Sequence, residues 1–211
     1  MTFIIAIQSS DSIILSADNR AISTDSNQKI TIHPQENIGK MATWNQGAIT
    51  GTGDYVTFQR MTNKLKINQD IGQLPAMLKE YCSIRKNEIG MHEQIDKTVI
   101  IYSYLEGLNP KLQFIHHDQG EIIKHDLQEN GLQLFMYKEE IGDILENLKK
   151  LQKSIKPRYC FETNEAWMSY YLIQFSEIYR TQSLHDESVS SSFDIFFQTA
   201  YEKVHKHVAS C

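Results

Sequence analysis

The chain has 211 residues, of which 41% are hydrophobic and 22% are charged, and its net charge is −5. This length and composition are ordinary for a globular protein, and we expect residues 1–211 to form a single domain that ends in a short helix or a mobile tail over 200–211. The negative charge and the scattered basic residues exclude a nucleic-acid-binding stripe. Because no apolar run is long enough to span a bilayer, we also expect no membrane contact.

Cysteine usage and the N-terminus indicate the compartment. The cysteines Cys82, Cys160 and Cys211 are odd in number and widely spaced, which argues against a disulfide scaffold or a zinc site. The apolar stretch at residues 3–7 has no basic residue before it and does not resemble a signal peptide. We therefore expect a cytoplasmic protein, in which removal of Met1 exposes Thr2.

The first sixty residues read as strands followed by a helix. Apolar runs at Thr2–Gln8 and Ser12–Ala17 are separated by a short polar break and predict a hairpin. Further elements follow in order: a loop at Ser23–Asn27, a short strand at Lys29–Ile32, a hairpin from Lys40–Trp44 and Gly47–Thr50, and a GTGD turn that places Asp54 near a helix N-terminus.

Beyond the GTGD turn, the hydrophobic period changes. Tyr55, Phe58, Met61 and Leu65 are spaced for one helix face, and residues 74–84 predict a second amphipathic helix with Pro75 in its first turn. The remaining expected elements are strands at Thr98–Tyr104, Lys111–His116, Glu121–Lys124 and Leu132–Tyr137, helices at Glu139–Lys153 and Thr163–Tyr179, and a strand at Ser192–Gln198.

This order of elements predicts the fold class. Blocks of strands alternate with pairs of helices, which favours an α+β fold with antiparallel sheets over a parallel doubly wound sheet. Two hairpin-rich sheets with paired helices on their outer faces would form a four-layer αββα sandwich.

The N-terminal stretch TFIIAIQSSDSIILSADNRA resembles the start of a mature proteasome β-type subunit, in the N-terminal-nucleophile (Ntn) hydrolase superfamily. That family opens with a threonine on a strand and ends its second strand in Ala-Asp-x-Arg, and the spacing from Thr2 to Asp18 fits without a gap. The stretch KMATWNQGAITGTGD follows the family order of lysine, hairpin, glycine turn and helix-opening acid. The resemblance covers residues 2 to about 60 closely, and thereafter only in the order of elements. It suggests a divergent, bacterial-type proteasome-like protein with the Ntn-hydrolase fold.

The resemblance implies a threonine-type hydrolase that cleaves peptide or amide bonds without a cofactor or metal. Thr2 would be the nucleophile, and its own α-amine would be the base. Lys40 would lower the pKa of that amine by like-charge repulsion, and Asp18 would hold the lysine charged. The backbone N–H of Gly51 would donate to the oxyanion, and a glycine there would let substrate backbone approach closely.

Two site assignments have alternatives. Lys29, in QKITIH, rivals Lys40 as the tuning lysine: counted from Asp18, Lys29 comes sooner than the family separation and Lys40 later, but counted back from the glycine turn Lys40 fits better. We therefore favour Lys40 and interpret residues 23–39 as a lengthened loop.

Near the C-terminus, HDESVSSSFDIFFQ supplies Glu187 and Ser190 where the family has an acid and a serine close to the threonine amine. Asp186 and Ser188 are the alternatives. A further family serine, in a glycine-rich turn ahead of the third helix, has no match in HDLQENGLQLF.

Two other functions compete with the hydrolase interpretation. A chain of this fold could serve as a non-catalytic scaffold subunit, or as a small-molecule amidase with the same reactive residues and a different pocket. The resemblance also implies ring or helical homo-oligomers, whereas an unfoldase partner cannot be inferred from one chain. Trp167, Tyr170 and Tyr171 would lie at a subunit interface or in the core.

The histidines offer a weaker case for a metal. His116 and His117 are adjacent on an expected strand and point to opposite faces, so they cannot both bind one ion. We expect them, together with His125, to be surface residues. His205 and His207 could bind a metal adventitiously, but they fall in the expected terminal tail.

Overall fold

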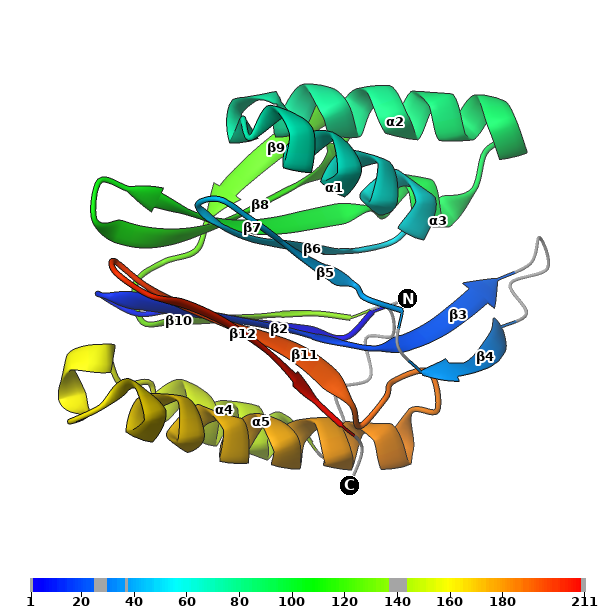
Figure 1. Ribbon diagram of the computed structural model, residues 1–211. Coiled ribbons are helices and arrows are strands. Elements are labelled where there is room, and N and C mark those ends of the chain that lie inside the picture. The colour runs from blue at the N-terminus through cyan, green and yellow to red at the C-terminus, as the bar shows by residue number, and fades with distance from the viewer. Residues whose placement is uncertain (1, 25–29, 37, 137–143, 210–211) are drawn as a thin grey trace.

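The computed structural model describes residues 2–24, 30–36, 38–136 and 144–209. Two five-stranded sheets are stacked face to face, and helices cover the outer face of each (Figure 1). Every strand pair among the described residues is antiparallel. The predicted α+β class and four-layer αββα sandwich are therefore confirmed.

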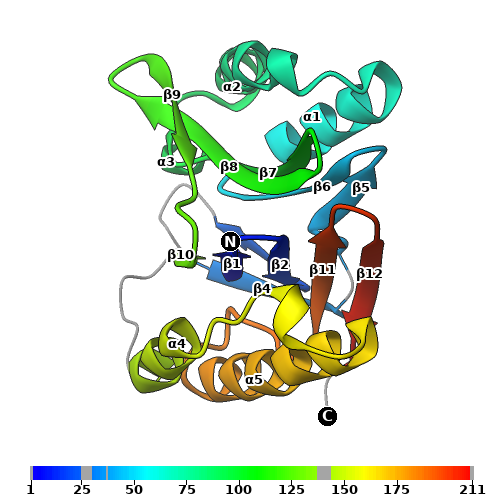
Figure 2. The same cartoon turned by 90° about the vertical axis from the view of Figure 1, so that its left-hand side faces the viewer.

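The first sheet contains the N-terminal hairpin at its centre. Its strand order is β10-β1-β2-β11-β12, and helices α4 and α5 lie together against its outer face (Figure 2). The elements of this half are β1 (Ile4–Gln8), β2 (Ser12–Asp18), β10 (Gly131–Phe135), α4 (Ile144–Lys153), a 3-10 turn (Arg158–Cys160), α5 (Asn164–His185), β11 (Phe193–Thr199) and β12 (Lys203–Val208).

The second sheet runs in sequence order, β5-β6-β7-β8-β9, beneath helices α1 and α2. A two-stranded ribbon, β3-β4, projects from the edge of the sandwich where the chain passes between the two sheets (Figure 1). The elements are β3 (Arg20–Thr24), β4 (Ile30–Glu36), β5 (Met41–Trp44), β6 (Gly47–Thr52), α1 (Tyr55–Asn68), a 3-10 turn (Ile71–Gln73), α2 (Leu74–Ile89), α3 (Glu93–Asp96), β7 (Val99–Glu106), β8 (Asn109–Asp118) and β9 (Glu121–Asp126).

Strand β1 is buried on both faces, which explains its unbroken apolar run. Ile5 and Ile7 pack with α4 and α5, whereas Ile4 and Ala6 belong to the apolar cluster between the two sheets. Successive strand residues point to opposite faces, so a strand covered on both sides must be apolar throughout.

The helix termini follow the sequence signals. Asp54 caps α1 by accepting a hydrogen bond from the Thr57 N–H at 2.8 Å, and Pro75 lies in the first turn of α2. Among the described residues, no helix is long and apolar enough to cross a membrane.

Several local predictions differ from the structure, and one had left two alternatives open. The expected short helix or mobile tail from residue 200 is wrong, because β12 pairs in full register with β11. Helix α5 continues to His185 rather than ending at Tyr179. Trp167 and Tyr171 are buried in the cluster beneath the first sheet, which confirms the core alternative for both. The interpretation of residues 23–39 as a lengthened loop is also wrong in the described part, because β3 and β4 pair there as a ribbon. Residues 25–27 of the expected loop lie outside the described residues.

The packing between the sheets can be tested by comparing substitutions at a buried and at an exposed aromatic residue. Phe196 is 1% exposed between the sheets, whereas Tyr201 is 87% exposed. Phe196→Ala removes a buried ring and should lower the free energy of unfolding by about 3–5 kcal/mol. Tyr201→Ala, the matched control, should change it by less than about 0.5 kcal/mol. Urea denaturation measures both, and equal effects would contradict the sandwich.

Candidate active site

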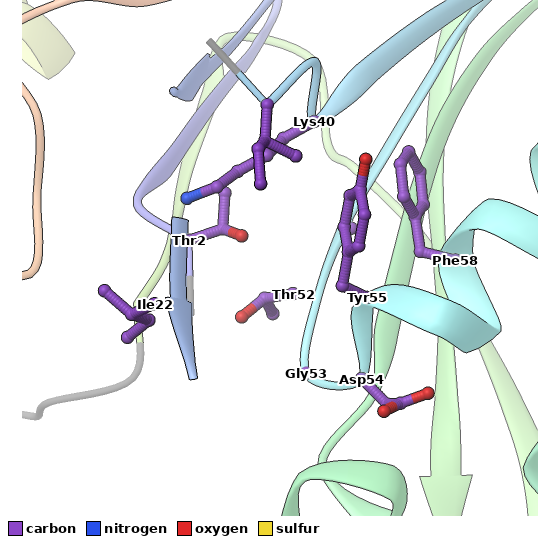
Figure 3. A pocket seen from close by; sticks show the side chains of 10 residues that line it. Thr2, Ile22, Lys40, Thr52, Gly53, Asp54, Tyr55 and Phe58 are labelled. Atoms are coloured by element: carbon purple, nitrogen blue, oxygen red, sulfur yellow. The ribbon is translucent and has the colours of Figure 1, made fainter. Parts of the chain in front are cut away.

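The expected site residues converge where the ends of the two sheets meet the N-terminus of α1. Thr2 lies two residues before β1, Lys40 directly precedes β5, and Gly51 lies near the end of β6. They border a cavity of about 170 Å³, into which the Thr2 and Lys40 side chains extend (Figure 3). Its lining residues are Thr2, Ile22, Ile38, Lys40, Gly51, Thr52, Gly53, Asp54, Tyr55 and Phe58.

A buried ion pair lies next to the cavity. The Lys40 Nζ donates to Asp18 Oδ1 at 2.9 Å, and the two side chains are only 5% and 0% exposed. The Lys40 carbonyl also accepts a hydrogen bond from the Thr50 hydroxyl at 2.6 Å, which anchors the start of β5 to β6. The rival lysine, Lys29, lies outside the described residues.

The Asp18 carboxylate also holds the backbone beside Thr2. It accepts the Phe3 N–H at 2.8 Å, the Arg20 N–H at 3.0 Å and the Ser190 N–H at 3.4 Å. Hydrogen bonds to an ionised acceptor are stronger than neutral ones. Asp18 therefore fixes the residue that follows Thr2 as well as the lysine next to it.

The burial of Lys40 shifts its acid–base behaviour. Desolvation lowers the pKa of the Lys40 ammonium below its ordinary value, and the nearby Arg20 charge lowers the pKa further. The charge and hydrogen bond of Asp18 oppose this shift. The ion pair with Asp18 thus works against the loss of charge that burial favours at Lys40.

The structure gives a different reason for the glycine at position 51 from the one that the sequence suggested. A Cβ at this position would lie 2.7 Å from the Val99 carbonyl oxygen and 3.3 Å from the Phe58 ring, so the glycine is required by the packing of β6 against β7 and α1. Substrate approach is not needed to explain it. The role of the Gly51 N–H as an oxyanion donor stays a prediction.

At the C-terminal side of the site, the structure separates the alternatives. The Glu187 side chain is exposed, and its backbone carbonyl accepts a hydrogen bond from Arg20 at 2.6 Å. Asp186 is buried and accepts hydrogen bonds from both the N–H and the hydroxyl of Ser188, at 2.9 and 2.6 Å. The geometry therefore favours Asp186 over Glu187 as the acid of this region.

Ser190 is fully buried beside the ion pair. In addition to the contact of its N–H with Asp18, its hydroxyl lies 2.8 Å from the Ser192 hydroxyl. The serine expected ahead of the third helix has no counterpart, because the sequence contains no serine between Ser103 and Ser154.

Sequence reasoning did not identify the walls of the cavity. Tyr55 and Phe58 project from the first turn of α1, with ring centroids 6.2 Å apart, and Ile22 lies on the opposite side (Figure 3). Ile38 also lines the cavity. The spacing of Tyr55 and Phe58 marked one helix face, but that face alone does not distinguish core from cavity. Ile22 lies just before residues 23–39, which the sequence analysis interpreted as a loop, and Ile38 lies within them.

Comparison with known proteins agrees with this architecture. No family model and no curated protein matches the chain. Among solved structures, a mutant form of Anbu from Hyphomicrobium sp. strain MC1 is similar, with a TM-score of 0.59 at 12% identity; the match covers 100% of this chain and 89% of that one. At this identity the likeness shows the fold alone.

The buried ion pair generates a stability prediction. Lys40→Met leaves the Asp18 charge buried without its partner and should destabilise the fold by about 3–5 kcal/mol. Lys97 forms an exposed pair with Glu93 at 2.6 Å, so the matched variant Lys97→Met should cost less than about 1 kcal/mol. Chemical denaturation of both variants provides the comparison, and a Lys40 effect no larger than that of Lys97 would refute the buried pair.

Gly51 allows a second test with a matched glycine. Gly51→Ala should cost about 1–3 kcal/mol because the new methyl group meets the Val99 carbonyl. A Cβ on Gly39 would contact nothing within 4 Å, so Gly39→Ala should be nearly neutral. Thermal unfolding of the two variants measures the difference. Two equally neutral alanines would mean that β6 does not pack as described.

Proposed function

We propose that this protein is an N-terminal-threonine hydrolase that cleaves peptide or amide bonds, with Thr2 as the nucleophile after Met1 is removed. One observation carries the proposal: Thr2 lies at a cavity beside the buried ion pair of Lys40 and Asp18. A free threonine hydroxyl is a weak nucleophile, and it requires a base and a positive field next to it.

The chemistry follows from these groups. The Thr2 hydroxyl attacks the substrate carbonyl carbon, and its proton passes to the Thr2 α-amine, whose ordinary pKa is about 7.7–8.0. The tetrahedral oxyanion accepts the Gly51 N–H. When the intermediate collapses, the C–N bond breaks and the leaving amine takes the proton. An ester on Thr2 remains, and water hydrolyses it to release the acid.

Each neighbouring residue has a positioning role in this scheme. The Lys40 charge favours the unprotonated amine and stabilises negative charge developing on the hydroxyl oxygen. Asp18 keeps Lys40 charged and holds the Phe3 N–H, so that the strand presents Thr2 in one orientation. Asp186, Ser188 and Ser190 would surround the amine from the other side.

The size of the cavity is also compatible with a second candidate, a small-molecule amidase. At about 170 Å³, it is smaller than the pockets of roughly 300–1,000 Å³ that hold whole ligands. It has room for one apolar side chain of a peptide, or for the acyl group of a small amide. A panel of peptide and simple amide substrates separates these two possibilities.

Association of several copies is part of the proposal. Ile173 and Leu184 are 73% and 75% exposed on α5, and such an assembly could cover them. The mass in solution from light scattering tests this directly.

We also propose a cytoplasmic location, supported by the free thiols Cys82 and Cys160, of which Cys160 is exposed.

The proposed function predicts a sharp dependence on one hydroxyl. Thr2→Ala should abolish turnover of the substrate panel, and Thr2→Ser should keep a measurable fraction because serine retains the hydroxyl. Thr43→Ala, at an exposed position on β5, is the matched control and should turn over like the unmodified protein. Turnover that survives Thr2→Ala would exclude the hydrolase, and a folded protein inert toward the whole panel would favour the scaffold.

A further inference from the structure

Two histidines face each other across the β8-β9 hairpin, apart from the candidate active site. The Nε2 atoms of His116 and His125 are 3.1 Å apart, and their rings are parallel to within 7°. Sequence reasoning compared His116 with His117, which points to the other face. The actual partner comes from the next strand, because the register pairs His116 with Ile123 and Phe114 with His125.

Both rings are held before any ligand arrives. The His116 Nδ1 lies 3.1 Å from the His117 carbonyl oxygen, which can only accept, so Nδ1 carries the proton and Nε2 presents a lone pair. The His125 ring stacks on Phe114 with ring centroids 4.8 Å apart. A backbone carbonyl on the distal ring nitrogen is the arrangement that orients histidines that bind metal ions.

The separation of the two nitrogens fits a shared ion. Metal–imidazole bonds are about 2.0–2.1 Å long, so two ligands at 90–109° to each other have nitrogens roughly 2.9–3.4 Å apart. The observed 3.1 Å falls inside that range. His125 is exposed and His116 is half-buried, so an ion can reach them from solvent.

We propose that His116 and His125 together bind one divalent transition metal ion, of the kind that favours imidazole ligands. Within the described residues, no group of three or more His, Cys, Asp or Glu side chains gathers around a common point. Water would therefore complete the coordination, which makes this an open site with two protein ligands. In the absence of an ion, the His125 Nε2–H can donate to the His116 lone pair.

The position of the site relates it to the cavity. Thr52, Val99 and His116 are directly opposite one another on β6, β7 and β8, and Thr52 lines the cavity. Two strand spacings separate Thr52 from His116, or about 10 Å. The metal site is thus at the same end of the sandwich as Thr2, but it does not depend on Thr2 being a nucleophile.

Calorimetric titration of the chelator-treated protein with Zn²⁺ tests the proposal. We expect one ion per chain, and at least a tenfold loss of affinity in His125→Asn, where the removed ring is exposed and the fold should persist. His116→Asn should behave in the same way, with circular dichroism checking that it folds. The double variant His205→Asn/His207→Asn removes a histidine pair on β12, at the edge of the other sheet, and should bind like the unmodified protein.

The contrary results are equally specific. Absence of Zn²⁺ binding by the unmodified protein would mean that the pair is only a hydrogen bond between two rings. Unchanged affinity in His125→Asn, or binding lost instead in the β12 double variant, would place the ion elsewhere and overturn the proposal. None of these outcomes depends on turnover, so they are independent of the proposed hydrolase activity.

Discussion

The buried ion pair between Lys40 and Asp18 is the interaction on which the candidate site depends. Two charges with side chains 5% and 0% exposed can persist only if each satisfies the other and the remaining lone pairs are bonded. Here three backbone N–H groups complete the shell of Asp18. The pair is therefore locked in one geometry, and it transmits that geometry to the backbone beside Thr2.

The ion pair also connects the two sheets of the sandwich. Asp18 ends β2 in one sheet and Lys40 directly precedes β5 in the other, so the ion pair ties the two sheets together where the chain crosses between them. Behind it, apolar residues such as Ile4 and Phe196 fill the space between the sheets and exclude water. Because water is excluded, an unpaired charge between the sheets would be costly. For the same reason, the electric field of Lys40 acts more strongly at the cavity.

Much of this organisation could be predicted from the sequence, because local patterns and the strand pairing agree. The isoleucine-rich runs of β1 and β2, the helix spacing after Asp54 and the order of element blocks all indicated the observed layers. The pairing of Asp18 with Lys40 was also expected, on the strength of a family resemblance rather than of spacing. The catalytic roles of these residues stay predictions.

The errors arose where tertiary contacts override local signals. Lys203–Val208 is a polar, histidine-rich segment, and only its pairing with β11 makes it a strand. Asp186 is buried whereas Glu187 is exposed, and this difference between neighbouring residues could not be read from the sequence. The pairing of His116 with His125 depended on hairpin register, and a shift of one residue would have pointed the two rings to opposite faces.

The most direct test of a nucleophilic Thr2 is the intact mass of the purified protein before and after incubation with a peptide epoxyketone. This reagent reacts with both the hydroxyl and the free amine of an N-terminal threonine. The proposed mechanism predicts loss of Met1 and a single adduct on Thr2. A folded protein that retains Met1, or that exposes Thr2 and stays unlabelled, would contradict the mechanism and leave Thr2 with no role beyond leading the chain into β1.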